Sequence, residues 1–100
     1  MTIMASFVTR VELYGTPSEE VYNNLHIAMK EKGFSRSFMD NGSRYDLPHS
    51  MYLLAGGISA TQTVAIAKEA AETVWKDFSV HVTETVVRME YYNLRLTKPY

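Results

Sequence analysis

The chain of 100 residues has no cysteine, which excludes a disulfide framework, a thiolate zinc site and a cysteine nucleophile. An excess of one charge is also missing, because ten Lys and Arg residues oppose eleven Asp and Glu residues. The formal net charge of -1 argues against a strongly basic nucleic-acid binder but leaves room for a local basic patch.

Long hydrophobic runs are scarce as well, and no window approaches the roughly 20 apolar residues of a membrane span. The opening MTIMASF has no basic segment and no long apolar core, so it does not read as a signal peptide. We therefore expect a cytoplasmic protein without membrane contact. No repeat, low-complexity run or linker divides the chain, and we expect one domain over residues 1–100.

Two segments have helical patterns. Residues 56–78 carry apolar side chains at spacings of three and four, on the face made by Val64, Ala67, Ala71, Val74, Trp75 and Phe78. Ser59 and Gln62 fit a capping box at the start of this helix. The earlier helix is predicted to begin with Thr16 as N-cap and Pro17 at the first helical position, and to end before a left-handed Gly33.

Alternation of apolar and polar residues predicts the strands. The first runs from about Ala5 to Tyr14, the second over residues 34–39, and the last over residues 79–87. Asn41-Gly42 predicts a hairpin turn. The third strand is interrupted: residues 44–47 return from the turn, Pro48 makes a bulge or bend, and residues 51–55 resume the strand. Residues 88–100 are a C-terminal extension that continues the last strand, adds a strand or crosses to a second subunit.

The order β-α-β-β-α-β predicts an α+β, ferredoxin-like fold. In that fold two helices cover one face of a four-stranded antiparallel sheet. The other face, with Val8 and Tyr14, stays bare and would suit a dimer partner or a strand of RNA.

A candidate catalytic site lies on the bare face if the last strand pairs with the first. His81 then lies near Arg10 and Glu12. A histidine can take the proton of an RNA 2′-hydroxyl while an arginine stabilises the phosphorane, so this set suits phosphodiester cleavage. The simpler interpretation is a surface histidine beside a cross-strand Arg-Glu pair.

Other polar residues carry weaker signals. Arg36, between two serines, and Arg44 could form a phosphate-binding patch across the hairpin, although a solvated hairpin is the commoner explanation. We interpret His26 as a solvated residue of the first helix and His49 as a structural turn residue. No metal-ligand spacing and no cofactor motif occurs, so we expect neither a metal nor a cofactor.

Four segments carry a family resemblance: FVTRVELYG, LHIAMKEKGFSRSF, YDLPHSMYLLAGGIS and AKEAAETVWKDFSVHVTE. Over roughly residues 7–84 the chain resembles the GhoS family, the endoribonuclease antitoxins of type V toxin-antitoxin systems. The resemblance implies a ferredoxin-like dimer that cleaves single-stranded RNA, in particular the toxin message. Small CRISPR-associated nucleases of similar fold use an aspartate at the end of the first strand for their metal, where this chain has Glu12-Leu13-Tyr14-Gly15.

Two hypotheses of different class follow. The first is a dimeric RNA-binding protein of the GhoS type that acts as a metal-independent endoribonuclease. The alternative is a non-enzymatic interaction module, for example a phage or mobile-element protein, that binds a protein partner through its open sheet face. The family resemblance favours the first hypothesis, and the near-neutral charge and apolar sheet residues favour the second.

Overall fold

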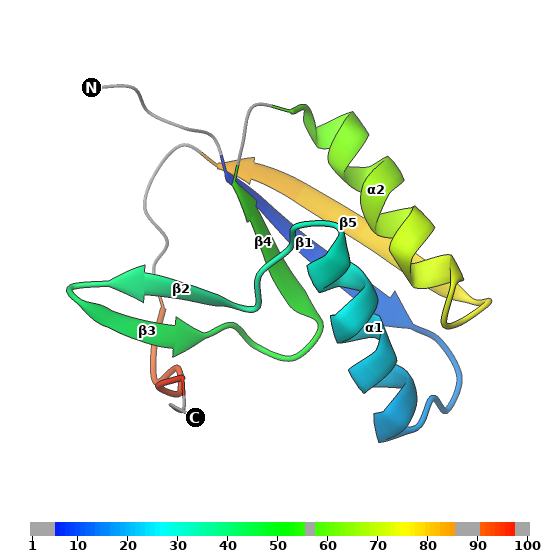
Figure 1. The fold of residues 1–100 in the computed structure, drawn as a ribbon, viewed down its shortest axis with the longest axis horizontal. Coiled ribbons are helices and arrows are strands. Elements are labelled where there is room, and N and C mark those ends of the chain that lie inside the picture. The colour runs from blue at the N-terminus through cyan, green and yellow to red at the C-terminus, as the bar shows by residue number, and fades with distance from the viewer. Residues whose placement is uncertain (1–5, 56–57, 86–90, 98–100) are drawn as a thin grey trace.

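The computed structural model describes residues 6–55, 58–85 and 91–97. Within these residues, five strands and two helices follow the order β1, α1, β2, β3, β4, α2, β5 along the chain (Figure 1). Their bounds are β1 Ser6–Leu13, α1 Glu19–Glu31, β2 Ser37–Asp40, β3 Ser43–Asp46, β4 Met51–Ala55, α2 Ala60–Glu72 and β5 Phe78–Thr85. Neither helix in the described chain is of the length and apolarity that crossing a bilayer requires.

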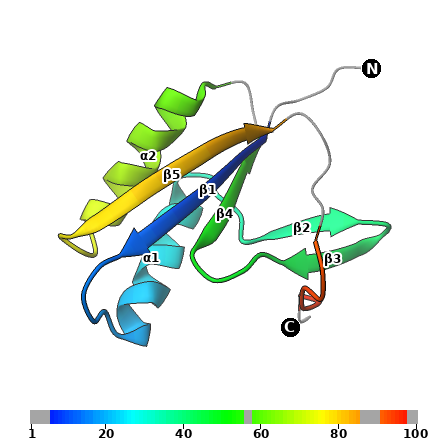
Figure 2. The same ribbon diagram turned by 180° about the vertical axis from the view of Figure 1, so that it is seen from behind.

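The central strand of the main sheet is β1, with β4 and β5 antiparallel on either side of it. Its alternate side chains face the core as predicted, and Phe7, Thr9, Val11 and Leu13 are all buried. Both helices lie on this same side of the sheet (Figure 1), and from behind the strands lie in front of them (Figure 2). Neither α1 nor α2 therefore covers the opposite side of the three strands.

The prediction of one four-stranded, ferredoxin-like sheet is wrong. Of the five described strands, β2 and β3 pair with each other and with no other strand, and they form a separate two-stranded sheet that projects from the main sheet as a hairpin (Figure 1). The segment before β2 meets β4 at one bridge, between Ser35 and Leu53.

The physical cause lies in the turn between β3 and β4. Pro48 has no N–H to donate to a ladder, and Ser50 adopts a left-handed φ of 70°. Met51 N–H donates to the Pro48 carbonyl at 3.1 Å and closes a turn. The predicted third strand is therefore two strands, which belong to different sheets.

The C-terminal residues pack against the hairpin. Asp46 N–H donates to the Arg95 carbonyl at 2.8 Å, and Thr97 N–H donates to the Arg44 carbonyl at 2.9 Å. Tyr45 of β3 and Leu96 form an antiparallel β-bridge between the hairpin and the C-terminal residues. Residues 95–97 thus extend the small sheet. The predicted end of the last strand, at residues 86–87, lies outside the described residues.

The first helix begins later than predicted. Ser18, not Thr16, is its N-cap, because the Ser18 hydroxyl accepts a hydrogen bond from Val21 N–H at 3.3 Å. Glu19 and Glu20 in the first turn complement the positive end of the helix dipole. Gly33 has a φ of 95°, which confirms its predicted left-handed conformation after the last turn.

The second helix is shorter than predicted. Its capping box is confirmed: Gln62 N–H donates to the Ser59 hydroxyl at 3.1 Å, and Ser59 N–H donates to the Gln62 side chain at 3.0 Å. The helix ends at Glu72, so Val74, Trp75 and Phe78 lie beyond it. The Trp75 indole donates to the Tyr14 carbonyl at 2.8 Å, a contact with the end of β1 made after the chain has left the helix.

The hydrophobic core lies between the main sheet and the two helices. Small residues form the buried face of α2, namely Thr63, Ala67, Ala70 and Ala71. Leu25 and Met29 of α1 and Tyr52 of β4 are fully buried beside them. The half-exposed Val64, predicted to lie on the buried face, is instead at its margin.

Candidate functional site

The strand register brings the predicted catalytic residues together on the open face of the main sheet. Arg10 of β1 lies directly opposite His81 of β5, and Glu12 lies opposite the neighbouring Ser79. An Arg10 Nη2 to Glu12 Oε1 distance of 3.7 Å joins the cation to the carboxylate. The histidine, the arginine and the glutamate thus form one cluster.

Solvent reaches this cluster freely. The Arg10 and Glu12 side chains are 64% and 48% exposed, and His81 is also exposed. An ion pair this exposed adds little to stability, so the arginine stays available to an anionic ligand.

An apolar border lies next to the cluster. On the other side of β1, Met51 of β4 pairs with Arg10, and Leu53 pairs with Val8. These three apolar side chains are only partly buried. A row of side chains therefore crosses three strands in the order His81, Arg10, Met51, from polar to apolar.

The two predicted phosphate-binding arginines do not join this row. Arg44 Nη1 donates to the Ser37 hydroxyl at 2.9 Å on the hairpin, and the β2–β3 register pairs Arg44 with Met39. Arg36 is exposed at the junction that leads into β2, where its carbonyl accepts from Leu47 N–H at 2.7 Å. Arg44 therefore contacts one of the two serines that flank Arg36, and phosphate binding by these two arginines stays a prediction.

A second polar cluster, absent from the predictions, lies between α1 and β4. His26 Nδ1 and the hydroxyl of the fully buried Tyr52 share a hydrogen bond of 2.6 Å. The His49 ring lies 5.6 Å from the His26 ring and 4.5 Å from the Tyr22 ring. The interpretation of His26 as a solvated residue is therefore wrong, because α1 turns it toward the core.

The electrostatics of this cluster favour neutral groups. Burial lowers the pKa of His26 from 6.5 to about 4, with smaller coulombic contributions from Arg36 and His49. Burial also raises the pKa of Tyr52 above its ordinary value. At neutral pH, His26 and Tyr52 are thus joined by a hydrogen bond between two uncharged groups, and this hydrogen bond is part of the core. Its one sequence signal is that His26 follows the buried Leu25 on α1.

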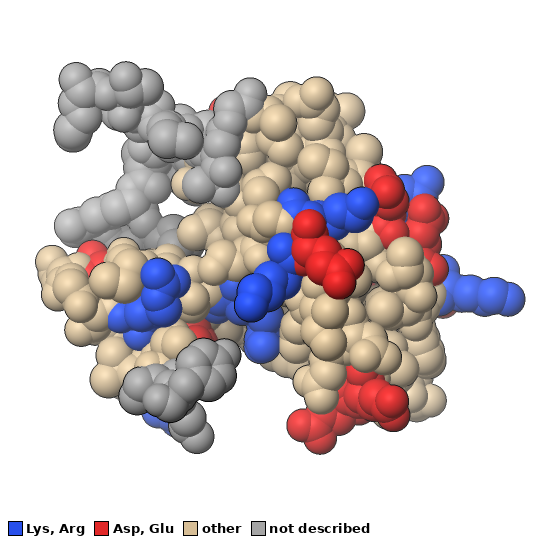
Figure 3. Space-filling model, in the orientation of Figure 1, with Lys and Arg blue, Asp and Glu red and all other residues tan. Residues whose placement is uncertain are grey.

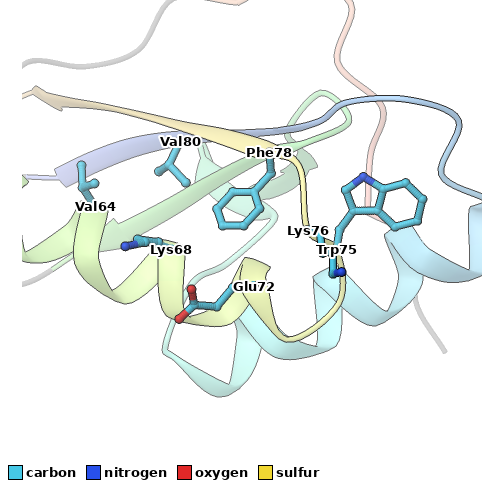
Figure 4. Close-up of a pocket in the computed structure, with 7 residues that line it drawn as sticks. All are labelled: Val64, Lys68, Glu72, Trp75, Lys76, Phe78 and Val80. Atoms are coloured by element: carbon cyan, nitrogen blue, oxygen red, sulfur yellow. The ribbon is translucent and has the colours of Figure 1, made fainter.

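A groove of 580 Å³ lies away from the open face, between α2 and β5, where Phe78 and Val80 point toward the helix (Figure 4). Lys68, Glu72 and Lys76 border it and alternate in sign. Basic and acidic side chains also lie side by side over the helix-covered face (Figure 3), as in the 2.9 Å Lys32–Glu69 ion pair. Among the described residues, acidic side chains thus interrupt the basic ones on this side of the molecule.

The described part of the chain contains no group of three or more His, Asp or Glu side chains arranged to hold a metal ion. The fold and the site define a small α+β protein with an exposed histidine–arginine pair on an open sheet face. No protein-family model matches this chain, and no curated protein matches it either. The resemblance to the GhoS family remains a prediction.

Proposed function

We propose that this protein binds single-stranded RNA on the open face of the main sheet and cleaves it as a metal-independent endoribonuclease. The observation that carries the proposal is the register that sets His81 opposite Arg10. The GhoS resemblance supports the same activity, with an antitoxin role in the cytoplasm and the toxin message as substrate.

The proposed reaction is an internal transesterification of the RNA chain. His81 takes the proton of a 2′-hydroxyl, and the 2′-oxygen attacks the adjacent phosphorus. The bond from phosphorus to the 5′-oxygen breaks, and the leaving oxygen takes a proton from water. The products are a 2′,3′-cyclic phosphate and a 5′-hydroxyl. Arg10 stabilises the charge of the phosphorane, and Glu12, 3.7 Å away, orients the guanidinium.

The test is an assay of single-stranded RNA cleavage in excess EDTA with analysis of the product ends. We expect the wild-type protein to produce the cyclic phosphate, and Arg10→Ala to cut about 10²–10³-fold more slowly. Lys76→Ala removes one positive charge at the distant α2–β5 groove and should cut at the wild-type rate. Cleavage that needs a divalent cation, or equal rates in Arg10→Ala and wild type, would contradict the proposal.

Partly exposed apolar side chains favour a second candidate function. Val8, Met51 and Leu53 lie on the same open face. A protein partner could cover them, as expected for a non-enzymatic interaction module. Absence of RNA cleavage by the wild-type protein would favour this candidate.

We further propose that the protein works as a homodimer. β5 is an edge of the main sheet, and within the described chain no strand pairs with its outer side. An unpaired edge is a template for a second copy. Light scattering coupled to gel filtration should give a mass near twice 11.4 kDa, and a monomer mass would contradict this part of the proposal.

A further inference from the structure

A pocket of 240 Å³ lies where the hairpin, β4 and the C-terminal residues meet. Its main walls are Phe38, Pro48, Met51, Tyr91, Tyr92 and Leu94. Among these side chains only the two tyrosines carry a hydrogen-bonding group. The volume is just below the roughly 300–1,000 Å³ of pockets for drug-sized ligands, so a smaller ligand with an apolar face fits it best.

One wall of the pocket is held rigidly. The Tyr91 hydroxyl donates to Asp40 Oδ2 at 2.5 Å, and the Tyr91 ring lies 5.3 Å from the rings of both Phe38 and Tyr45. A wall fixed in this way loses little conformational entropy when a ligand enters.

The other tyrosine is almost free of contacts. Tyr92 is 92% exposed, although it lines the same pocket. An aromatic ring with an open face beside an apolar pocket is the arrangement on which unpaired bases stack.

The pocket is continuous with the proposed catalytic row. Met51 belongs to the pocket and lies opposite Arg10, which in turn lies opposite His81. Neighbouring strands are about 4.8 Å apart, so one strand spacing separates the pocket wall from Arg10 and a second separates Arg10 from His81. A base held at Met51 would leave its own ribose and phosphate over the arginine.

We propose that this pocket binds one unpaired nucleobase of the RNA, next to the phosphodiester that is cut. The inference rests on the proposed function, because RNA is taken as the ligand. Stacking on Tyr92 would select single strands, since a paired base cannot enter. Few polar groups face the base edges, so the pocket should accept different bases with similar affinity.

The test measures binding without cleavage, with the full chain and two probes. The first probe is adenosine 5′-monophosphate, and its binding is detected by changes in the NMR signals of the tyrosine rings. The second is a fluorescent 2′-O-methyl RNA hexamer, which lacks the nucleophilic hydroxyl. Tyr92→Ala should weaken hexamer binding about 5- to 100-fold, the range of one lost stack. Tyr92→Phe, and Ile27→Ala at an exposed apolar position of α1, should bind within about twofold of wild type.

The outcomes separate this inference from the proposed cleavage. Equal hexamer binding by Tyr92→Ala and wild type would overturn the base pocket and leave the catalytic row untouched. Tyr92-dependent binding by a protein that cuts no RNA would overturn the endoribonuclease and support the pocket. A wild-type protein that binds neither probe would overturn the pocket as well.

Discussion

At the scale of single residues, the hydrogen bond between His26 and Tyr52 couples folding to pH. Its 2.6 Å length joins a half-buried imidazole to a fully buried phenol. Because burial disfavours the imidazolium, the folded protein holds His26 neutral over a range in which the unfolded chain binds a proton.

This difference sets the sign of a pH dependence. The unfolded chain takes up a proton near pH 6.5 and the folded protein only near pH 4, so the free energy of unfolding should decrease as the pH falls between them. A fully buried ring would lose about 3 kcal/mol, and we expect about 1–2 kcal/mol for this half-buried one. Urea denaturation at several pH values measures the effect. His26→Gln should lose it, and an identical pH slope in that variant would refute the assignment.

Removing the imidazole should also leave the phenol without its partner. We expect His26→Ala to lower the free energy of unfolding by about 1–3 kcal/mol at pH 7, because the buried Tyr52 hydroxyl becomes unsatisfied. Adding Tyr52→Phe to this variant should recover part of the loss, which a double-mutant cycle measures. Strictly additive effects of the two substitutions would mean that the hydrogen bond contributes nothing.

At the scale of elements, the hairpin depends on two left-handed residues. Asn41 and Gly42 have φ values of 50° and 80°, the positive angles of the tight turn that the Asn-Gly pair predicts. Nothing lies within 4 Å of a Cβ added at Gly42, so a substitution there would cause backbone strain alone.

Gly42→Ala should therefore destabilise the protein by about 1 kcal/mol, the cost of an L-residue in the left-handed region. Asn41→Gly is the matched control and should change stability by only a few tenths of a kcal/mol. Thermal unfolding of the three proteins distinguishes these outcomes. No loss of stability in Gly42→Ala would show that the turn tolerates another conformation.

Local features such as the Asn41-Gly42 turn could be predicted from the sequence. The Ser59–Gln62 capping box, the left-handed Gly33 and the alternating pattern of β1 are each set by residues close together in the sequence. The end of α2 could not be predicted, because Trp75 continues the apolar spacing of the helix. Its indole instead donates a hydrogen bond to the Tyr14 carbonyl, 61 positions away in the sequence. The inward turn of His26 depends likewise on a distant partner, Tyr52.

At the scale of the whole molecule, the division into two sheets could not be predicted from alternation. The predicted strands within residues 34–55 fit one continuous sheet, whereas the left-handed Ser50 after Pro48 directs β3 and β4 into different ones. The β1–β5 pairing brought His81 to Arg10 as the candidate site required. The pocket proposed to bind a nucleobase could not be predicted from the sequence, because it forms only where the C-terminal residues pack against the hairpin.

The division into two sheets also determines which side chains lie on the open face of the main sheet. Both helices lie on one side of the main sheet (Figure 2). The strand register places the row of His81, Arg10 and Met51 on the other side, with one residue from each of β5, β1 and β4. In the proposed complex, a strand of RNA laid across β4, β1 and β5 would meet the apolar pocket at β4, the Arg10 guanidinium on β1 and the His81 imidazole on β5. His81 is the proposed general base of the cleavage.

The most direct test compares the rate of single-stranded RNA cleavage by His81→Ala with that of the wild type, in EDTA at pH 7. Thr83→Ala, two residues along the same face of β5, is the matched control. We predict a loss of about 10²–10⁴-fold for His81→Ala, the usual contribution of a general base, and a near wild-type rate for the control. Equal rates in His81→Ala and wild type would contradict the account.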